Sequence, residues 1–182
     1  MSFSIHAITP DFAAEIGDID LSQPLSKDDQ EGIKQTFWKF GVLIFPEQKL
    51  TQQQHIDFAK IFGPIEMDRV LAAEHADPRL GHAFADISNL TRDGRIWDRN
   101  SRARMYKEGN KLWHTDSSFK YKPGLCSLLY STSVVPIGGH TEFADQRAAY
   151  DALSPEMKTR LDGLIAMHGI DRKSTRLNSS HS

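Results

Sequence analysis

Apolar residues recur at helical spacing near the start of this 182-residue chain. Ile33, Phe37 and Phe40 form one stripe, which predicts a helix with one buried face. Ser26 is a typical N-cap residue, and Gly41 is a typical residue at which a helix ends. We therefore expect a helix between these two positions.

A short apolar run at 42–45 follows directly and predicts a buried strand. A proline marks its end. Thr51 and Gln54 have the spacing of a capping box, so a second helix is expected to begin there. Its inward residues are predicted to be Phe58, Ile61 and Phe62. Gly63 and the proline after it are expected to end this helix.

The remaining pattern alternates strands and helices without repeats. Apolar runs predict strands at 83–88, 125–135, 141–143 and 164–170. A turn with two glycines, at 136–139, is expected before the third of these strands. Helices are predicted at 148–153 and after Ser154, the second with an apolar face of Met157, Leu161 and Leu164. The fold class expected from these elements is mixed α/β.

Composition narrows the choice of partners. The chain is 39% hydrophobic and 25% charged, enough for one ordinary core, and its formal net charge of −2 favours neither nucleic acid nor a membrane. Nothing resembles a signal peptide or a membrane span. The single Cys126 excludes an internal disulfide and is compatible with a cytoplasmic location; it is better explained as a buried strand residue than as a reactive thiol. Monomers and homo-oligomers both fit these features.

Residues 91–111 differ from the rest, with seven Lys or Arg against three Asp or Glu and little periodicity. We interpret them as a long loop. One explanation is a solvated basic loop, and the other is a lid that meets an anionic substrate. The lid is slightly favoured, because the loop runs directly into the segment with the most informative chemistry.

That segment contains His114-Thr115-Asp116. In an extended chain, side chains alternate between faces, so His114 and Asp116 are expected to point the same way. One imidazole and one carboxylate on the same face are two thirds of the ligand set, two histidines and a carboxylate, that is typical of non-heme Fe(II). The third ligand has to come from elsewhere.

Several segments together resemble one family. They are residues 40–45, 58–64, 87–90, 109–119 and 138–145 with 148–153, and they occur in order between residues 5 and 170. The chain resembles the TauD/TfdA family of Fe(II)/2-oxoglutarate-dependent dioxygenases, and within it the TfdA-like branch that acts on small organic acids. One His-x-Asp motif alone is weak evidence, but five ordered segments are strong.

The resemblance implies a mixed α/β fold with a mainly β core, a double-stranded β-helix or jelly-roll with flanking helices. It implies that His114 and Asp116 bind Fe(II), that Thr141 binds a carboxylate of the cosubstrate 2-oxoglutarate, and that O2 is consumed. The expected reaction hydroxylates a small organic acid and releases succinate and CO2. Asn89 and Asn110 are candidate substrate contacts, although loop-stabilising Asx turns explain them as well.

The sequence also departs from the family pattern, which has a second histidine and then an arginine far downstream. His140, His168 and His181 are weaker candidates for that ligand, because a ligand needs fixed geometry as well as proximity. The expectation is a C-terminally truncated member. Residues 1–171 would be the N-terminal portion of the dioxygenase domain, and residues 172–182, with one apolar residue in eleven, a disordered and non-native tail.

Three functional hypotheses follow. The first is the dioxygenase itself. The second is an inactive fragment or metal-binding module that lacks the distal histidine and arginine. The third is a metal-dependent jelly-roll enzyme that does not use 2-oxoglutarate, against which the Gly138-Gly139-His140-Thr141 turn argues.

Overall fold

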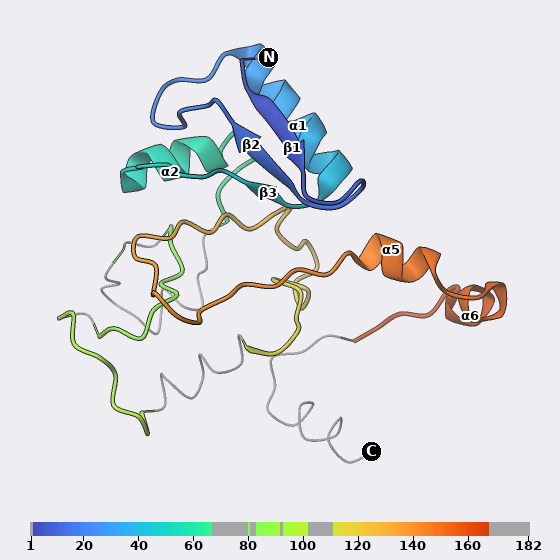
Figure 1. Ribbon diagram of the computed structural model, residues 1–182. Coiled ribbons are helices and arrows are strands. Elements are labelled where there is room, and N and C mark those ends of the chain that lie inside the picture. The colour runs from blue at the N-terminus through green and yellow to red at the C-terminus, as the bar shows by residue number, and fades with distance from the viewer. Residues whose placement is uncertain (1, 67–79, 81–82, 92, 102–110, 168–182) are drawn as a thin grey trace. The chain divides into compact units, whose positions relative to one another are not determined.

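A computed structural model describes residues 2–66, 80, 83–91, 93–101 and 111–167. These residues belong to two compact units. The first unit combines the chain up to residue 62 with residues 128–167, and the second runs from residue 63 to residue 127. All the described helices and strands lie in the first unit (Figure 1).

A three-stranded sheet organises the first unit, in the order β1 (Ser4–Ala7), β2 (Ala14–Gly17), β3 (Leu43–Ile44). β1 and β2 are antiparallel, whereas β2 and β3 are parallel and are joined by a crossover that contains a helix, as is usual for parallel strands. Along β2, Ala14 and Ile16 are buried and Glu15 is exposed, so one face of the central strand contributes to the core. The strand predicted at 42–45 is therefore confirmed, in a shorter form.

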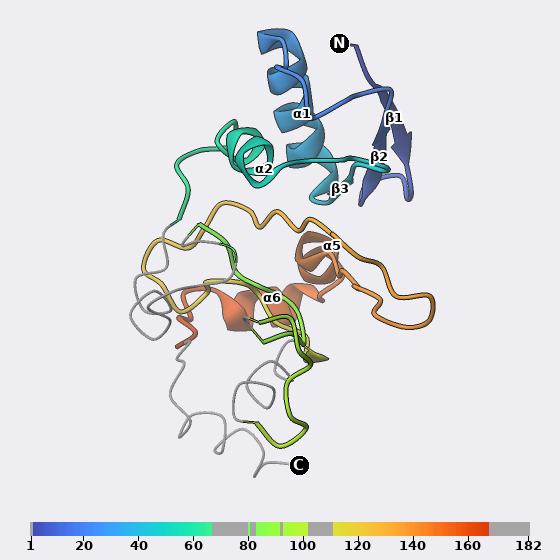
Figure 2. The same ribbon diagram turned by 90° about the vertical axis from the view of Figure 1, so that its left-hand side faces the viewer.

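The helix α1 (Lys27–Phe40) lies against one face of this sheet (Figures 1 and 2). The Ser26 hydroxyl accepts a hydrogen bond from the backbone N–H of Asp29 at 3.1 Å, as expected for an N-cap. At the other end, Gly41 adopts φ of +72° and donates its N–H to the carbonyl of Phe37 at 2.7 Å. Both predicted ends of the helix are confirmed.

The helix α2 (Gln52–Ala59) begins with the predicted capping box. The Thr51 hydroxyl accepts from the N–H of Gln54, and the Gln54 side chain accepts from the N–H of Thr51 at 2.8 Å. The α-helix ends at Ala59, before the predicted Gly63. The backbone then tightens, because Ile61 and Phe62 donate to carbonyls three residues earlier, as in a 3₁₀ turn.

The core of the first unit is small and aromatic. Leu21, Ile33 and Phe58 form its buried centre, with Ile33 fully inaccessible. Phe58 stands edge-on to Phe45 and Phe62, with ring centroids 5.3 and 5.9 Å apart. Further half-buried apolar residues pack around this centre: Phe3, Ile19, Leu25, Leu43, Leu50, Ile61 and Leu128.

Two short helices follow later in the chain. α5 (Gln146–Asp151) starts two residues before the predicted position because Asp145 caps it, and α6 (Pro155–Leu161) starts after Ser154, as predicted. The expected apolar face of α6 is present in the sequence but is not buried, since Met157 and Leu161 are 39% and 42% exposed. None of the described helices is long and apolar enough to cross a membrane.

Arg147 fastens the start of α5 to the end of α1. Its guanidinium donates to the carbonyls of Trp38 and Lys39 at 3.2 and 3.1 Å, where the helix leaves its last carbonyls unpaired. It also pairs with Asp145 at 3.0 Å, and this interaction lowers the pKa of the Asp145 carboxyl. The contact joins two elements more than a hundred residues apart in sequence.

The strands predicted at 83–88, 125–135 and 141–143 are not observed as strands. Within the part of the chain that the structure describes, none of them forms a β ladder. An extended segment becomes a strand only when a neighbouring strand satisfies its backbone groups, and a local apolar pattern cannot supply that neighbour. The turn at 136–139 is confirmed, with φ of +80° and +71° at Gly138 and Gly139.

The two most C-terminal predictions are described only in part. Residues 164–167 do not form a strand. The rest of that expected strand and the expected tail at 172–182 lie outside the described residues.

Candidate metal centre

His114 and Asp116 lie side by side in the second unit, as their spacing predicts. Residues 113–115 have no regular secondary structure, and a turn begins at Asp116. Ser117, with φ of +56°, bends the chain away immediately after the carboxylate. The His114 Nε2 atom is 3.3 Å from Oδ1 of Asp116.

The other ring nitrogen of His114 defines its tautomer. Nδ1 is 2.7 Å from the carbonyl oxygen of Leu112, and a carbonyl can only accept, so Nδ1 carries the hydrogen and donates it. In the neutral ring, Nε2 therefore presents its lone pair toward Asp116. A backbone carbonyl that holds the second nitrogen in this way is the usual arrangement of a metal-binding histidine.

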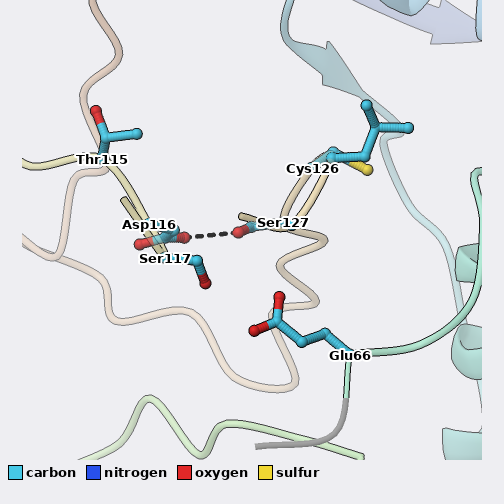
Figure 3. A pocket seen from close by; sticks show the side chains of 8 residues that line it. Glu66, Thr115, Asp116, Ser117, Cys126 and Ser127 are labelled. Carbon is cyan, nitrogen blue, oxygen red and sulfur yellow. Dashed lines mark hydrogen bonds between the residues drawn. The ribbon is translucent and has the colours of Figure 1, made fainter. Parts of the chain in front are cut away.

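Asp116 is held in a comparable manner. The Ser127 hydroxyl donates to Oδ2 of Asp116 at 2.6 Å, and Figure 3 shows the two side chains facing each other. The opposite oxygen, Oδ1, is the one that faces His114. Each side chain of the pair thus has one polar atom engaged by the protein and one directed at its partner.

Two lone-pair atoms 3.3 Å apart repel each other unless a proton or a cation lies between them. The two side chains are 48% and 61% exposed, and an exposed ion pair of this kind contributes about 0–1 kcal/mol to stability. Stability alone is therefore a weak explanation for the arrangement. Adjacent ligands of one metal ion, with bonds of about 2.1 Å, lie about 3 Å apart, so the donor set and its spacing fit a divalent cation.

The described residues supply two donors and no third. Among them, no three His, Cys, Asp or Glu side chains come together as a group that could hold a metal. The histidines at 168 and 181 lie outside the described residues, and His140 is exposed in the first unit. The pair is therefore a partial centre within the described structure.

A cavity of about 250 Å³ lies beside Asp116 (Figure 3). Thr115, Asp116, Ser117, Glu66 and the segment 124–127 line it. Glu66 comes from a distant part of the sequence and forms an ion pair with Lys120.

Cys126 is a half-buried member of this lining. Cys126 was predicted to be a buried strand residue. It is half-buried, which agrees in part, but its segment does not form a strand. The burial raises the pKa of the Cys126 thiol, which disfavours the thiolate needed of a nucleophile or ligand.

The other predicted site residues are placed as follows. Thr141 is exposed and belongs to the first unit, whereas His114 and Asp116 belong to the second. Asn89 is exposed in the second unit, and its backbone carbonyl accepts from the N–H of Trp97 at 2.9 Å, next to an isolated antiparallel bridge between Leu90 and Ile96. Asn110 lies outside the described residues.

The basic loop is described in part, over 91, 93–101 and 111. The Thr91 N–H donates to the Arg95 carbonyl, and the Arg95 side chain pairs with Asp93 at 2.6 Å while remaining 83% exposed. At this position the solvated-loop explanation is the better one.

Sequence reasoning missed Ser127 and Glu66. Neither belongs to a motif, and both reach the cavity through tertiary contacts, with Ser127 eleven residues after Asp116 and Glu66 fifty residues before it. The only available sign for Ser127 was its polar character within an apolar run.

Comparisons with known proteins agree on one family. Residues 4–181 match the family described as taurine catabolism dioxygenase TauD, TfdA family. The alpha-ketoglutarate-dependent 2,4-dichlorophenoxyacetate dioxygenase of Cupriavidus pinatubonensis is 39% identical over 168 residues, which cover 92% of this chain and 58% of that protein. The (S)-phenoxypropionate/alpha-ketoglutarate-dioxygenase of Sphingobium herbicidovorans is 37% identical over 148 residues, 79% of this chain and 46% of that protein.

Solved structures give the same result. AAD-2 in complex with Mn(II) and N-oxalylglycine matches with a TM-score of 0.76 and 35% identity, over 89% of this chain and 54% of that chain. A taurine dioxygenase from Burkholderia xenovorans matches with a TM-score of 0.67 and 25% identity, over 90% of this chain and 52% of that one. These proteins have the jelly-roll fold, which confirms the predicted fold class. The chain spans about half the length of the relatives it matches.

Proposed function

Because the chain belongs to the taurine catabolism dioxygenase TauD, TfdA family, we propose that it forms part of an Fe(II)- and 2-oxoglutarate-dependent dioxygenase. The observation that carries the proposal is the geometry of His114 and Asp116. Their facing atoms are 3.3 Å apart, and the second polar atom of each is held by a hydrogen bond. Such an arrangement presents two fixed donors to one cation.

In the proposed centre, His114 would hold Fe(II) with Nε2 and Asp116 with Oδ1, the two atoms that face each other. When bound, Fe(II) together with 2-oxoglutarate and O2 supplies the oxidant that hydroxylates a C–H bond, with succinate and CO2 as co-products. The chain contributes the placement of the donors. The Leu112 carbonyl orients the imidazole, and the Ser127 hydroxyl orients the carboxylate.

Thr141 is the proposed partner of the cosubstrate. Its hydroxyl can donate one hydrogen bond to a carboxylate oxygen of 2-oxoglutarate. The two glycines of the turn before it, both at positive φ, let the backbone come close to a ligand.

A small organic acid is the proposed substrate. Two relatives are named for phenoxyacetate and phenoxypropionate compounds, both of which are carboxylic acids. Asn89 and Asn110 remain the proposed substrate contacts, as hydrogen-bond donors for such an acid. A cytoplasmic location is proposed as well, supported by the single cysteine.

The test is succinate formation by the intact gene product supplied with Fe(II), 2-oxoglutarate, O2 and a panel of aryloxy acids. His114→Ala and Asp116→Ala should each abolish turnover. His6→Ala is the matched control, because His6 is exposed on β1 and its ring Nε2 lies 3.1 Å from the Ser4 hydroxyl, a contact outside the proposed centre. Turnover that survives in His114→Ala would refute the assignment.

A metal-binding module without turnover is the second candidate. The two-donor centre found among the described residues favours it. It predicts that the wild-type protein binds a divalent cation through His114 but releases no succinate with any acid of the panel.

A further inference from the structure

We propose that Ser127 is a positioning residue for the metal ligand Asp116. By holding Oδ2, its hydroxyl selects Oδ1 as the oxygen that faces His114. The inference rests on the proposed function, since it assigns to Ser127 a role in the same metal centre.

The direction of the hydrogen bond is fixed by chemistry. A carboxylate can only accept, so the Ser127 Oγ–H donates, and the 2.6 Å separation is typical of a charge-assisted O–H···O⁻ bond. Such bonds are about twice as strong as neutral ones. The two residues come from segments on two sides of the cavity, as Figure 3 shows.

An aspartate needs such a partner in order to present one oxygen reliably. The terminal torsion of Asp is broad and roughly two-fold, so a free carboxylate rotates easily and exchanges its two oxygens. His114 has no comparable freedom, because the Leu112 carbonyl holds its ring. The orientation of the Asp116 carboxylate depends on a side chain instead, because the Ser127 hydroxyl donates to its Oδ2 atom.

A purely stabilising role explains the contact less well. Both Asp116 and Ser127 are exposed, and a hydrogen bond in contact with water adds little to the free energy of folding. Its removal should therefore change ligand orientation far more than stability. Partners of this kind around metal sites commonly change metal affinity by 10- to 100-fold when they are lost.

The experiment measures the binding of Co(II), added alone as a stand-in for Fe(II), to the intact gene product by visible absorption. Ser127→Ala should raise the dissociation constant at least about tenfold and alter the Co(II) spectrum. Ser127→Thr should restore both, because it keeps the hydroxyl and the exposed site has room for a methyl group. Ser131→Ala is the matched control, since this exposed serine is four residues further along the chain and its hydroxyl donates to the nearby Ser133 carbonyl at 3.3 Å.

The outcomes separate this inference from the proposed function. Equal affinity and an equal spectrum for wild type and Ser127→Ala would overturn the positioning role and leave the metal pair intact. Weak binding in both Ser127→Ala and Ser127→Thr would also overturn it, because the hydroxyl would then not be the cause. If the wild-type gene product binds no Co(II), the metal pair itself is wrong and the inference falls with it.

Discussion

Replacing Ile33 with alanine should destabilise the first unit more than any exposed substitution of the same kind. Ile33 is fully inaccessible in the middle of α1, and it packs with Leu21 and Phe58 at the centre of the core. A truncated side chain there leaves a cavity that its aromatic neighbours can fill only partly.

The size of the effect follows from what is removed. The substitution deletes three carbon atoms, which at about 0.8 kcal/mol per buried methylene gives about 2.4 kcal/mol. The residual cavity adds to this, so we expect a total loss of about 3 kcal/mol in the free energy of unfolding. For a small domain stable by about 5–15 kcal/mol, the unit should remain folded.

Urea denaturation followed by far-UV circular dichroism is the appropriate assay, because the described helices lie in the first unit. With a slope of about 2 kcal/mol per molar urea, the midpoint should fall by about 1.5 M. Ile137→Ala is the control, since Ile137 is 91% exposed and its loss should cost less than about 0.5 kcal/mol. Equal midpoints for the two variants would refute the reasoning about this core.

Three further predictions concern local structure, each measured as a urea midpoint. Thr51→Ala should cost about 1 kcal/mol by removing the capping box of α2, and Thr51→Ser should restore most of it. Gly41→Ala should cost about 1–2 kcal/mol, because φ of +72° strains any residue with a Cβ; an unchanged midpoint would contradict this. Hydrogen bonds from the Ser26 hydroxyl, and after it from groups of Ser2, lower the pKa of the Asp29 carboxyl. The stability that the ionised Asp29 contributes is therefore complete above its unfolded pKa of about 3.9, and it is lost as the pH falls through the lower folded pKa. The Asp29→Asn variant should therefore lose less stability than the wild type when the pH is lowered. Identical pH profiles for the two proteins would contradict this prediction.

Features with local causes could be predicted from the sequence. Ser26, Thr51 and Ser154 each cap a helix through atoms within three residues, so a short pattern contains the whole interaction. The side-by-side placement of His114 and Asp116 has a similar basis, because the two residues are only two positions apart in the sequence.

Features that depend on distant partners could not be predicted. The Arg147 contact with the end of α1 and the Ser127 contact with Asp116 join segments that no short pattern relates. The strand expected at 125–135 failed for a similar reason, because apolar content does not specify a pairing strand. Thr141 was identified through family resemblance, and its role remains a prediction.

The central claim is that His114 binds a metal through Nε2 beside Asp116. Proton NMR of the chain loaded with Co(II) tests this claim most directly. A ligand of this kind keeps its Nδ1 hydrogen, which the Leu112 carbonyl accepts, so that hydrogen should give a strongly hyperfine-shifted signal that disappears in D2O. We predict that the signal is present in the wild type and absent in His114→Ala. Absence of the signal in the Co(II)-saturated wild type, or its survival in His114→Ala, would contradict the account.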